Sequence, residues 1–60
     1  MKFKYYINAI CVGKNDMEKF PLNFFVTCDY NIDFDKEKVI DQVKTEIENR
    51  GFIDGSYTIN

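Results

Sequence analysis

The chain contains no histidine and only two cysteines, Cys11 and Cys28, which removes the common routes to catalysis and metal binding. Histidine is the most frequent general base in enzymes, and a cysteine nucleophile normally needs a neighbouring cation or imidazole to ionise its thiol. Zinc sites of the Cys2His2 kind are excluded for the same reason. We therefore expect no enzyme activity, no cofactor and no metal site.

Long apolar runs and a surplus of positive charge are also missing. No uncharged stretch exceeds the length of residues 5–13, which is far shorter than the roughly 20 residues that a membrane-spanning helix needs. The net charge of −2 is unsuited to a general binder of nucleic acids or anionic membranes. The first residues show no signal peptide. We expect a cytoplasmic protein that contacts no membrane and for which nucleic acid is not the main partner.

What the sequence does have is the composition of a small globular domain. Of its 60 residues, 45% are hydrophobic and 17% aromatic, which is too apolar for intrinsic disorder. We interpret residues 1–60 as a single domain. A chain of this length buries only about 60% of the surface that it exposes when unfolded, and such chains are usually supported by disulfides, a metal or association.

Two segments, residues 2–12 and 20–30, alternate between apolar and polar positions with the period of a β-strand. The turn-forming residues 13–16 separate them, so the two segments are predicted to form a β-hairpin. The core face is predicted to contain the odd-numbered residues of the first strand and the even-numbered residues of the second.

Matching these core faces predicts the register of the hairpin. A loop of about six residues places Cys11 opposite Phe20 and Phe3 opposite Cys28, whereas a four-residue loop is the main alternative. In the first register the two cysteines lie on the order of 26 Å apart, and a disulfide needs Cα atoms within about 7 Å. We predict two reduced, core-facing thiols. On the opposite face, this register pairs Tyr6 with Phe25 and Lys2 with Asp29.

Residues 35–50 are predicted to form an amphipathic helix. One apolar stripe consists of Val39, Ile40, Val43 and Ile47, which recur at helical spacing. Asp35 is the preferred N-cap, with Asp33 as a close second, and Phe34 is placed to pack on Val39 as a hydrophobic staple. Gly51 suits the left-handed position that commonly ends a helix.

The last segment, residues 52–59, is predicted to be a third strand, with Ile53, Tyr57 and Ile59 on one face and Gly55 as a weak point or bulge. The fold class is therefore α+β. We expect a ββαβ domain in which one helix packs on one face of a three-stranded antiparallel sheet of order 2-1-3. Pro21 supports this order, because proline belongs on an edge strand; the alternative order 1-2-3 would bury it.

An acidic segment, residues 29–35, has oxygen-bearing side chains at alternate positions, like the start of an EF-hand calcium loop. The match fails at the sixth position, where Phe34 replaces the required glycine, and at the twelfth, where Ile40 replaces the bidentate glutamate. We interpret this segment as a polar connection between the second strand and the helix. Its acidic side chains are favourable near the positive, N-terminal end of the helix dipole.

The face of the sheet away from the helix carries more apolar residues than a solvated surface needs. A contiguous patch of this kind is typical of an interface, and the residues that we expect to form it are Tyr6, Ile10, Val12 and Phe25. We expect self-association. Two sheets could stack through this face, or the strand at residues 52–59 could pair with its counterpart across a two-fold axis.

Lys2 and Lys4 lie beside Tyr6 and Phe25 on the same face, and basic residues next to aromatic rings are also used by single-strand nucleic-acid platforms. A nucleic-acid-binding or regulatory accessory protein is therefore the alternative function. A structural subunit of a larger assembly is a third.

The function that we predict is a non-enzymatic protein-binding module that occludes a partner. The abundance of Lys, Asn, Asp and Ile is typical of an AT-rich genome. Small proteins of this kind are often phage-encoded inhibitors of a host protein, such as a component of a defence system. The expected partners are a second copy of the chain and a host protein.

Overall fold

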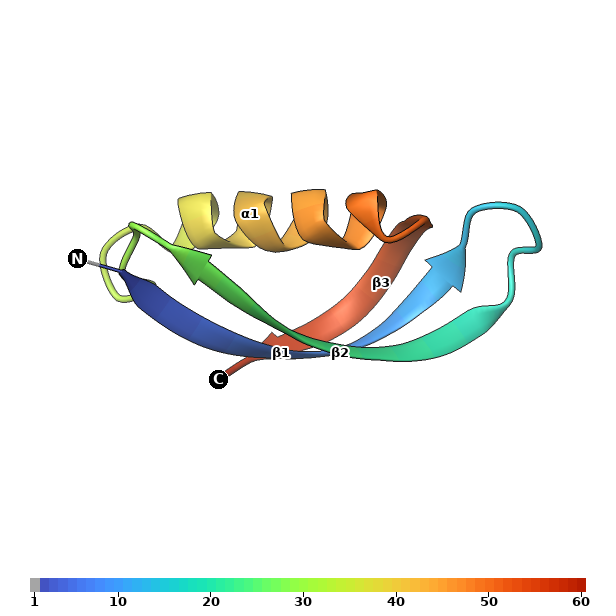
Figure 1. The fold of residues 1–60 in the computed structure, drawn as a ribbon, viewed down its shortest axis with the longest axis horizontal. Coiled ribbons are helices and arrows are strands. Elements are labelled where there is room, and N and C mark those ends of the chain that lie inside the picture. Colours follow the sequence, from blue (N-terminus) through green and yellow to red (C-terminus); the bar gives the residue numbers. More distant parts are fainter. Residues whose placement is uncertain (1) are drawn as a thin grey trace.

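The computed structural model describes residues 2–60, apart from the side chain of Asp54. The chain forms an α+β fold of ββαβ order, with a three-stranded antiparallel sheet of order β2-β1-β3 and one helix, as predicted (Figure 1). The elements are β1 (Phe3–Gly13), β2 (Lys19–Cys28), α1 (Lys36–Asn49) and β3 (Phe52–Ile59).

The predicted hairpin register is confirmed. Cys11 pairs with Phe20 and Phe3 pairs with Cys28, so the four-residue loop is excluded. The hairpin closes where the Gly13 N–H donates a hydrogen bond of 2.8 Å to the Glu18 carbonyl. Within this turn Met17 adopts a left-handed backbone with φ 59°, which is unfavourable for a residue with a Cβ and which the sequence did not predict.

Pro21 occupies a position where its missing N–H costs the sheet no hydrogen bond. Tyr6 and Asn60 exchange two backbone hydrogen bonds of 3.0 and 2.9 Å, so the even-numbered residues of β1 direct their backbone groups toward β3. The odd-numbered residues then face β2, and the pair Ile10–Pro21 is one that is not hydrogen-bonded. The proline nitrogen therefore points to the outer side of an edge strand, as the order 2-1-3 requires.

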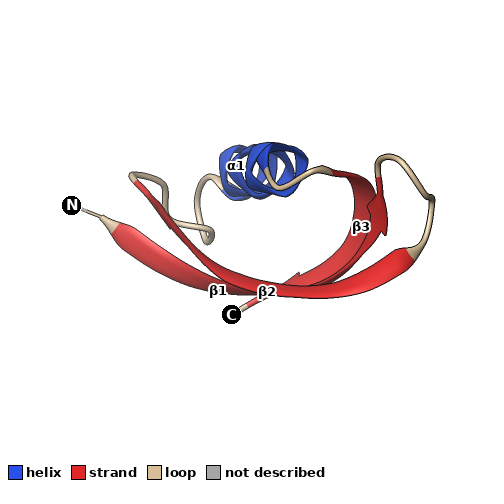
Figure 2. Cartoon of the chain, turned by 45° about the vertical axis from the view of Figure 1, so that its right-hand side comes forward, coloured by secondary structure: helices blue, strands red, loops and turns tan. Residues whose placement is uncertain are grey.

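The helix lies in the trough of a curved sheet, and the core fills the space between them (Figure 2). Ile7 and Cys11 of β1 and Val39 and Val43 of α1 are completely buried. Cys28 is also buried, and both cysteines are thiols on the core face, as predicted. The other buried hydrophobic residues of the core cluster are Tyr5, Ala9, Phe24, Val26 and Ile47.

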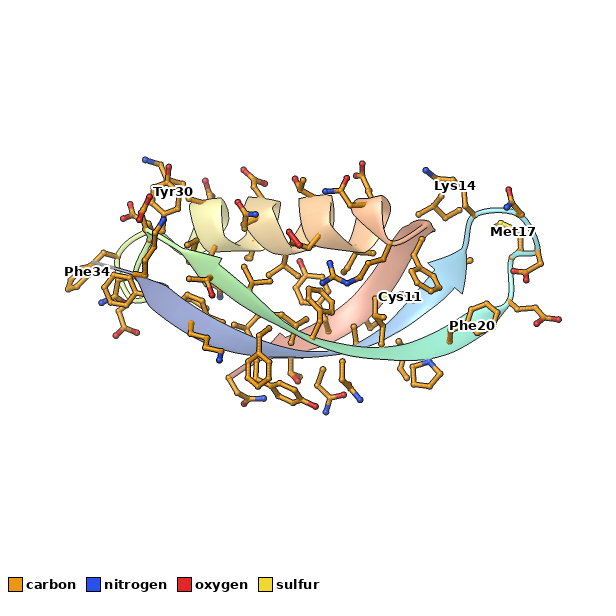
Figure 3. All side chains as sticks on the ribbon, in the orientation of Figure 1. Cys11, Lys14, Met17, Phe20, Tyr30 and Phe34 are labelled. Atoms are coloured by element: carbon orange, nitrogen blue, oxygen red, sulfur yellow. The ribbon has the colours of Figure 1, made fainter. Side chains whose placement is uncertain are left out.

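The two ends of the helix differ in how well the sequence predicted them. Gly51 has φ 92° and donates its N–H to the Glu48 carbonyl at 3.0 Å, which confirms the predicted C-terminal signal. Asp35 is the N-cap residue, but its side chain makes no capping hydrogen bond. The staple prediction was wrong, because a turn that bonds the Phe34 and Asp35 N–H groups to the Asn31 carbonyl leaves Phe34 84% exposed at the end of the molecule (Figure 3).

The bulge in β3 lies at Ile53 rather than at Gly55. Val12 pairs with residue 54 and Gly13 with Phe52, so Ile53 is the extra residue. Phe52 consequently packs against the core, its ring centroid 5.9 Å from that of Phe20, whereas Ile53 is 45% exposed.

Gly55 is needed for close approach to the central strand. It pairs with Cys11, and a Cβ at this position would lie 2.7 Å from the Ile10 carbonyl oxygen and 3.0 Å from the Cys11 Sγ. A side chain would therefore push β3 away from β1.

A buried tyrosine ties the loop before the helix to the sheet. The Tyr5 hydroxyl donates a hydrogen bond of 2.9 Å to the Tyr30 carbonyl and accepts one of 2.8 Å from the Ile32 N–H. Strand β2 ends at Cys28, so Tyr30 does not continue its core face as predicted. The Tyr30 ring instead lies 5.0 Å from the Lys38 Nζ, and its side chain is partly exposed.

We expect Tyr5→Phe to lower the free energy of unfolding by about 1–2 kcal/mol, because it leaves two loop backbone groups without their hydrogen-bond partner. Tyr6→Phe removes the same hydroxyl from the adjacent, exposed position and should change stability by less than about 0.5 kcal/mol. Urea unfolding of both variants measures the difference. Equal losses would show that the Tyr5 hydroxyl has no special role in holding the loop.

Candidate functional site

The structure brings the predicted interface residues to the convex face of the sheet, on the side opposite the helix. Phe25, Ile10 and Tyr6 are 58%, 48% and 36% exposed, respectively. Val12 lies on the same face but is half-buried. This placement follows from the pleat, because the core face takes the odd-numbered residues of β1 and the even-numbered residues of β2.

An aromatic pair dominates one part of this open face. Tyr6 and Phe25 lie directly opposite each other on β1 and β2, with ring centroids 5.1 Å apart and an interplanar angle of 53°. The Lys4 Nζ lies 4.5 Å from the Phe25 centroid, within the range of a cation–π contact. The two rings and the ammonium group thus form one small cluster on the surface.

The sequence predicts one contiguous apolar patch on the open face, whereas the structure divides its apolar residues into two groups. Asn8 on β1 pairs with Asn23 on β2 and Thr58 on β3, and this polar row lies between the aromatic pair and Ile10. Beyond it is a shallow depression of about 230 Å³, lined by Ile10, Val12, Lys19, Gly55 and Ser56. The open face therefore offers two apolar areas with a hydrogen-bonding row between them.

The pairing of Lys2 with Asp29 is confirmed at the end of the hairpin nearest the N-terminus. The Lys2 Nζ lies 2.9 Å from the Asp29 Oδ1, and both side chains are largely exposed. The hydrogen bond from Lys2, followed by its Coulomb attraction, lowers the pKa of the Asp29 carboxyl below the usual 3.8. The charge of Lys2 is therefore partly offset by its neighbour.

The acidic segment 29–35 uses its polar atoms to build a turn. The Asn31 side-chain oxygen accepts a hydrogen bond of 2.9 Å from the Asp33 N–H, and the Asn31 carbonyl accepts from Phe34 and Asp35. Within the part of the chain that the structure describes, no group of three or more Cys, Asp or Glu side chains is placed to hold a metal ion.

A groove between the helix and β3 was missed by the sequence reasoning. It has a volume of about 250 Å³, with Ile47 of α1 and Ile53 and Tyr57 of β3 as its apolar lining. Lys44, Glu48 and Gly55 complete it. The nearest signal in the sequence was Gly55, a residue without a side chain between the apolar positions Ile53 and Tyr57 of the same strand.

The chain matches no protein-family model, no curated protein and no solved structure. Among the described residues, no helix is long and apolar enough to cross a membrane.

We expect the pKa of the Asp29 carboxyl, followed by NMR titration, to lie below 3.8 in the wild type and to rise toward this value in Lys2→Gln. Because the pKa of the folded state is the lower one, the pair stabilises the fold above the pKa of the unfolded state. This contribution is lost as the pH falls through the pKa of the folded state. Lys4→Gln is the control and should leave Asp29 unchanged. An unaltered Asp29 titration in Lys2→Gln would contradict the assignment.

Proposed function

We propose that the chain is a non-enzymatic protein-binding module whose contact surface is the open face of the sheet. The observation that carries the proposal is the exposure of Phe25, Ile10 and Tyr6 on a face that the helix does not cover. Aromatic and aliphatic residues grouped on a surface are typical of protein interfaces, particularly when polar groups lie among them.

The contacts of the aromatic pair favour a protein partner over a nucleic acid. A base-stacking platform needs accessible ring faces and cations that can follow a phosphate backbone. Here Lys4 lies over the Phe25 ring, Tyr6 packs against that ring, and Lys2 is paired with Asp29. The polar row of Asn8, Asn23 and Thr58 is uncharged, which suits hydrogen bonds to another protein better than contacts with phosphate.

We propose that the module acts by covering a surface of its partner. The chain has no histidine, and the two thiols lie in the core at 0% and 6% exposure, where a substrate does not reach them. An inhibitor that blocks a host protein, encoded by a phage, is the form of this function that we propose from the composition. The cytoplasm is the compartment that we propose, since it keeps such thiols reduced.

Affinity capture followed by binding measurements with the purified captured protein tests the open face. We expect Phe25→Ala and Ile10→Ser each to weaken binding at least about tenfold, the effect of losing roughly 1.4 kcal/mol at the centre of an interface. Phe34→Ala is the matched control, because it removes an exposed aromatic ring from the loop before the helix, at the end of the molecule.

Unchanged binding by Phe25→Ala and Ile10→Ser, together with a loss in Phe34→Ala, would refute the assignment of the open face. Capture of nucleic acid that is released steeply by rising salt would instead support the alternative function of this face. Circular dichroism of each variant shows whether the fold is retained, so that a folding defect is not read as a binding defect.

A further inference from the structure

The two edges of the sheet differ in how well they are protected against pairing with another strand. The outer edge of β2 carries Lys19 and Pro21, two residue types that hinder strand addition. Strand β3 contains no lysine, arginine or proline. It pairs with β1 along one side, and among residues 2–60 no strand pairs with its other side.

The backbone of β3 is oriented to accept a further strand. Asn60 exchanges both hydrogen bonds with Tyr6, so the even-numbered residues of β3 face β1. Tyr57 and Ile59 therefore direct their N–H and C=O groups away from β1, toward the outer edge. Because β1 already holds β3 in an extended conformation, an added strand could form its backbone hydrogen bonds without a rearrangement of β3.

We propose that β3 pairs antiparallel with β3 of a second copy of this chain, across a two-fold axis that passes beside Ser56. This register places Tyr57 opposite Gly55 of the second copy and Ile59 opposite Ile53. An aromatic ring across from a glycine covers backbone that the glycine leaves exposed, and two isoleucines form a favourable cross-strand pair.

Neighbouring registers fit less well. A shift of the axis to Gly55 places the two glycines opposite each other, and a shift to Tyr57 leaves Ile53 without an opposing residue of β3. The axis at Ser56 also gives the longest overlap between the bulge at Ile53 and the end of the strand at Ile59.

The groove beside the edge supports a second copy as the occupant. Its apolar lining includes Ile53, which is 45% exposed and would be covered by Ile59 of the second copy. Its polar lining contains one cation, Lys44, and one anion, Glu48, both exposed on α1. The two charges cancel, so the groove brings no surplus charge of one sign to the joined edge.

The resulting sheet has six strands in the order β2-β1-β3-β3-β1-β2, with both helices on one side. The two open faces lie next to each other on the opposite side. The proposed dimer does not depend on the proposed function of the open face. An experiment can therefore refute either proposal and leave the other intact.

Disulfide cross-linking tests the register. In the proposed dimer Ser56 faces its own copy as a pair that is not hydrogen-bonded, where Cβ atoms lie about 4.5–5.5 Å apart and small adjustments allow a disulfide. We expect Ser56→Cys to form a covalent dimer on oxidation with glutathione disulfide. Thr58→Cys is the matched control on the same face of β3; its two copies would lie about 14 Å apart, and it should stay monomeric on a denaturing gel without reductant.

Sedimentation at micromolar concentration tests the interface without cross-linking. We expect a wild-type dimer that Ile53→Lys weakens at least tenfold, because a lysine at an edge strand opposes strand addition. Ile10→Ser, on the open face, should remain dimeric. A monomeric wild type, cross-linking of Thr58→Cys as strong as that of Ser56→Cys, or a dimer lost in Ile10→Ser and kept in Ile53→Lys would overturn the proposal. Peptide mapping confirms that residue 56 is cross-linked rather than the buried Cys11 or Cys28.

Discussion

The alternation of side chains along β1 is the constraint on which the rest of the structure depends. This strand pairs with both other strands, and its odd-numbered residues supply four of the buried side chains, Tyr5, Ile7, Ala9 and Cys11. A slip of one residue in either pairing would turn one apolar row away from the helix. The hydrophobic core thus sets the register, and the register in turn sets which residues the open face and the outer edge of β3 present.

Most of the backbone plan could be predicted because it follows from patterns that are local in sequence. Alternating strands, a helical stripe, Pro21 and Gly51 each restrict the structure by steric or hydrogen-bonding rules that need no knowledge of distant contacts. The agreement of these signals is why the order of the strands and the hairpin register were correct.

The features that were missed depend on contacts between distant segments. The Tyr5 hydroxyl holds Tyr30 and Ile32, some 25 residues away in the sequence, and no periodic pattern announces such a bond. The bulge at Ile53 arises because Phe52 takes the core position beside Phe20, which depends on how the helix returns to the sheet. Asn8, by contrast, interrupts the apolar part of the open face because the local alternation of β1 places it between Tyr6 and Ile10.

The sheet exposes two surfaces with different physical character. The open face offers side chains, and in the proposed binding of a protein its selectivity would come from the shapes of the aromatic pair and the polar row. The outer edge of β3 offers backbone groups, and in the proposed dimer its selectivity would come from the side chains on either side of Gly55. Joining two edges leaves both open faces accessible, so the two surfaces are compatible within one assembly.

The curvature of the sheet has a further consequence for whatever meets the open face. The helix lies on the concave side, so the exposed side bulges outward along a molecule with extents of 38 × 15 × 14 Å (Figure 2). A flat partner would touch such a ridge only along its crest, whereas a partner with a cleft would enclose its flanks as well. For the proposed protein partner, the shape therefore favours a surface with a cleft that encloses this ridge.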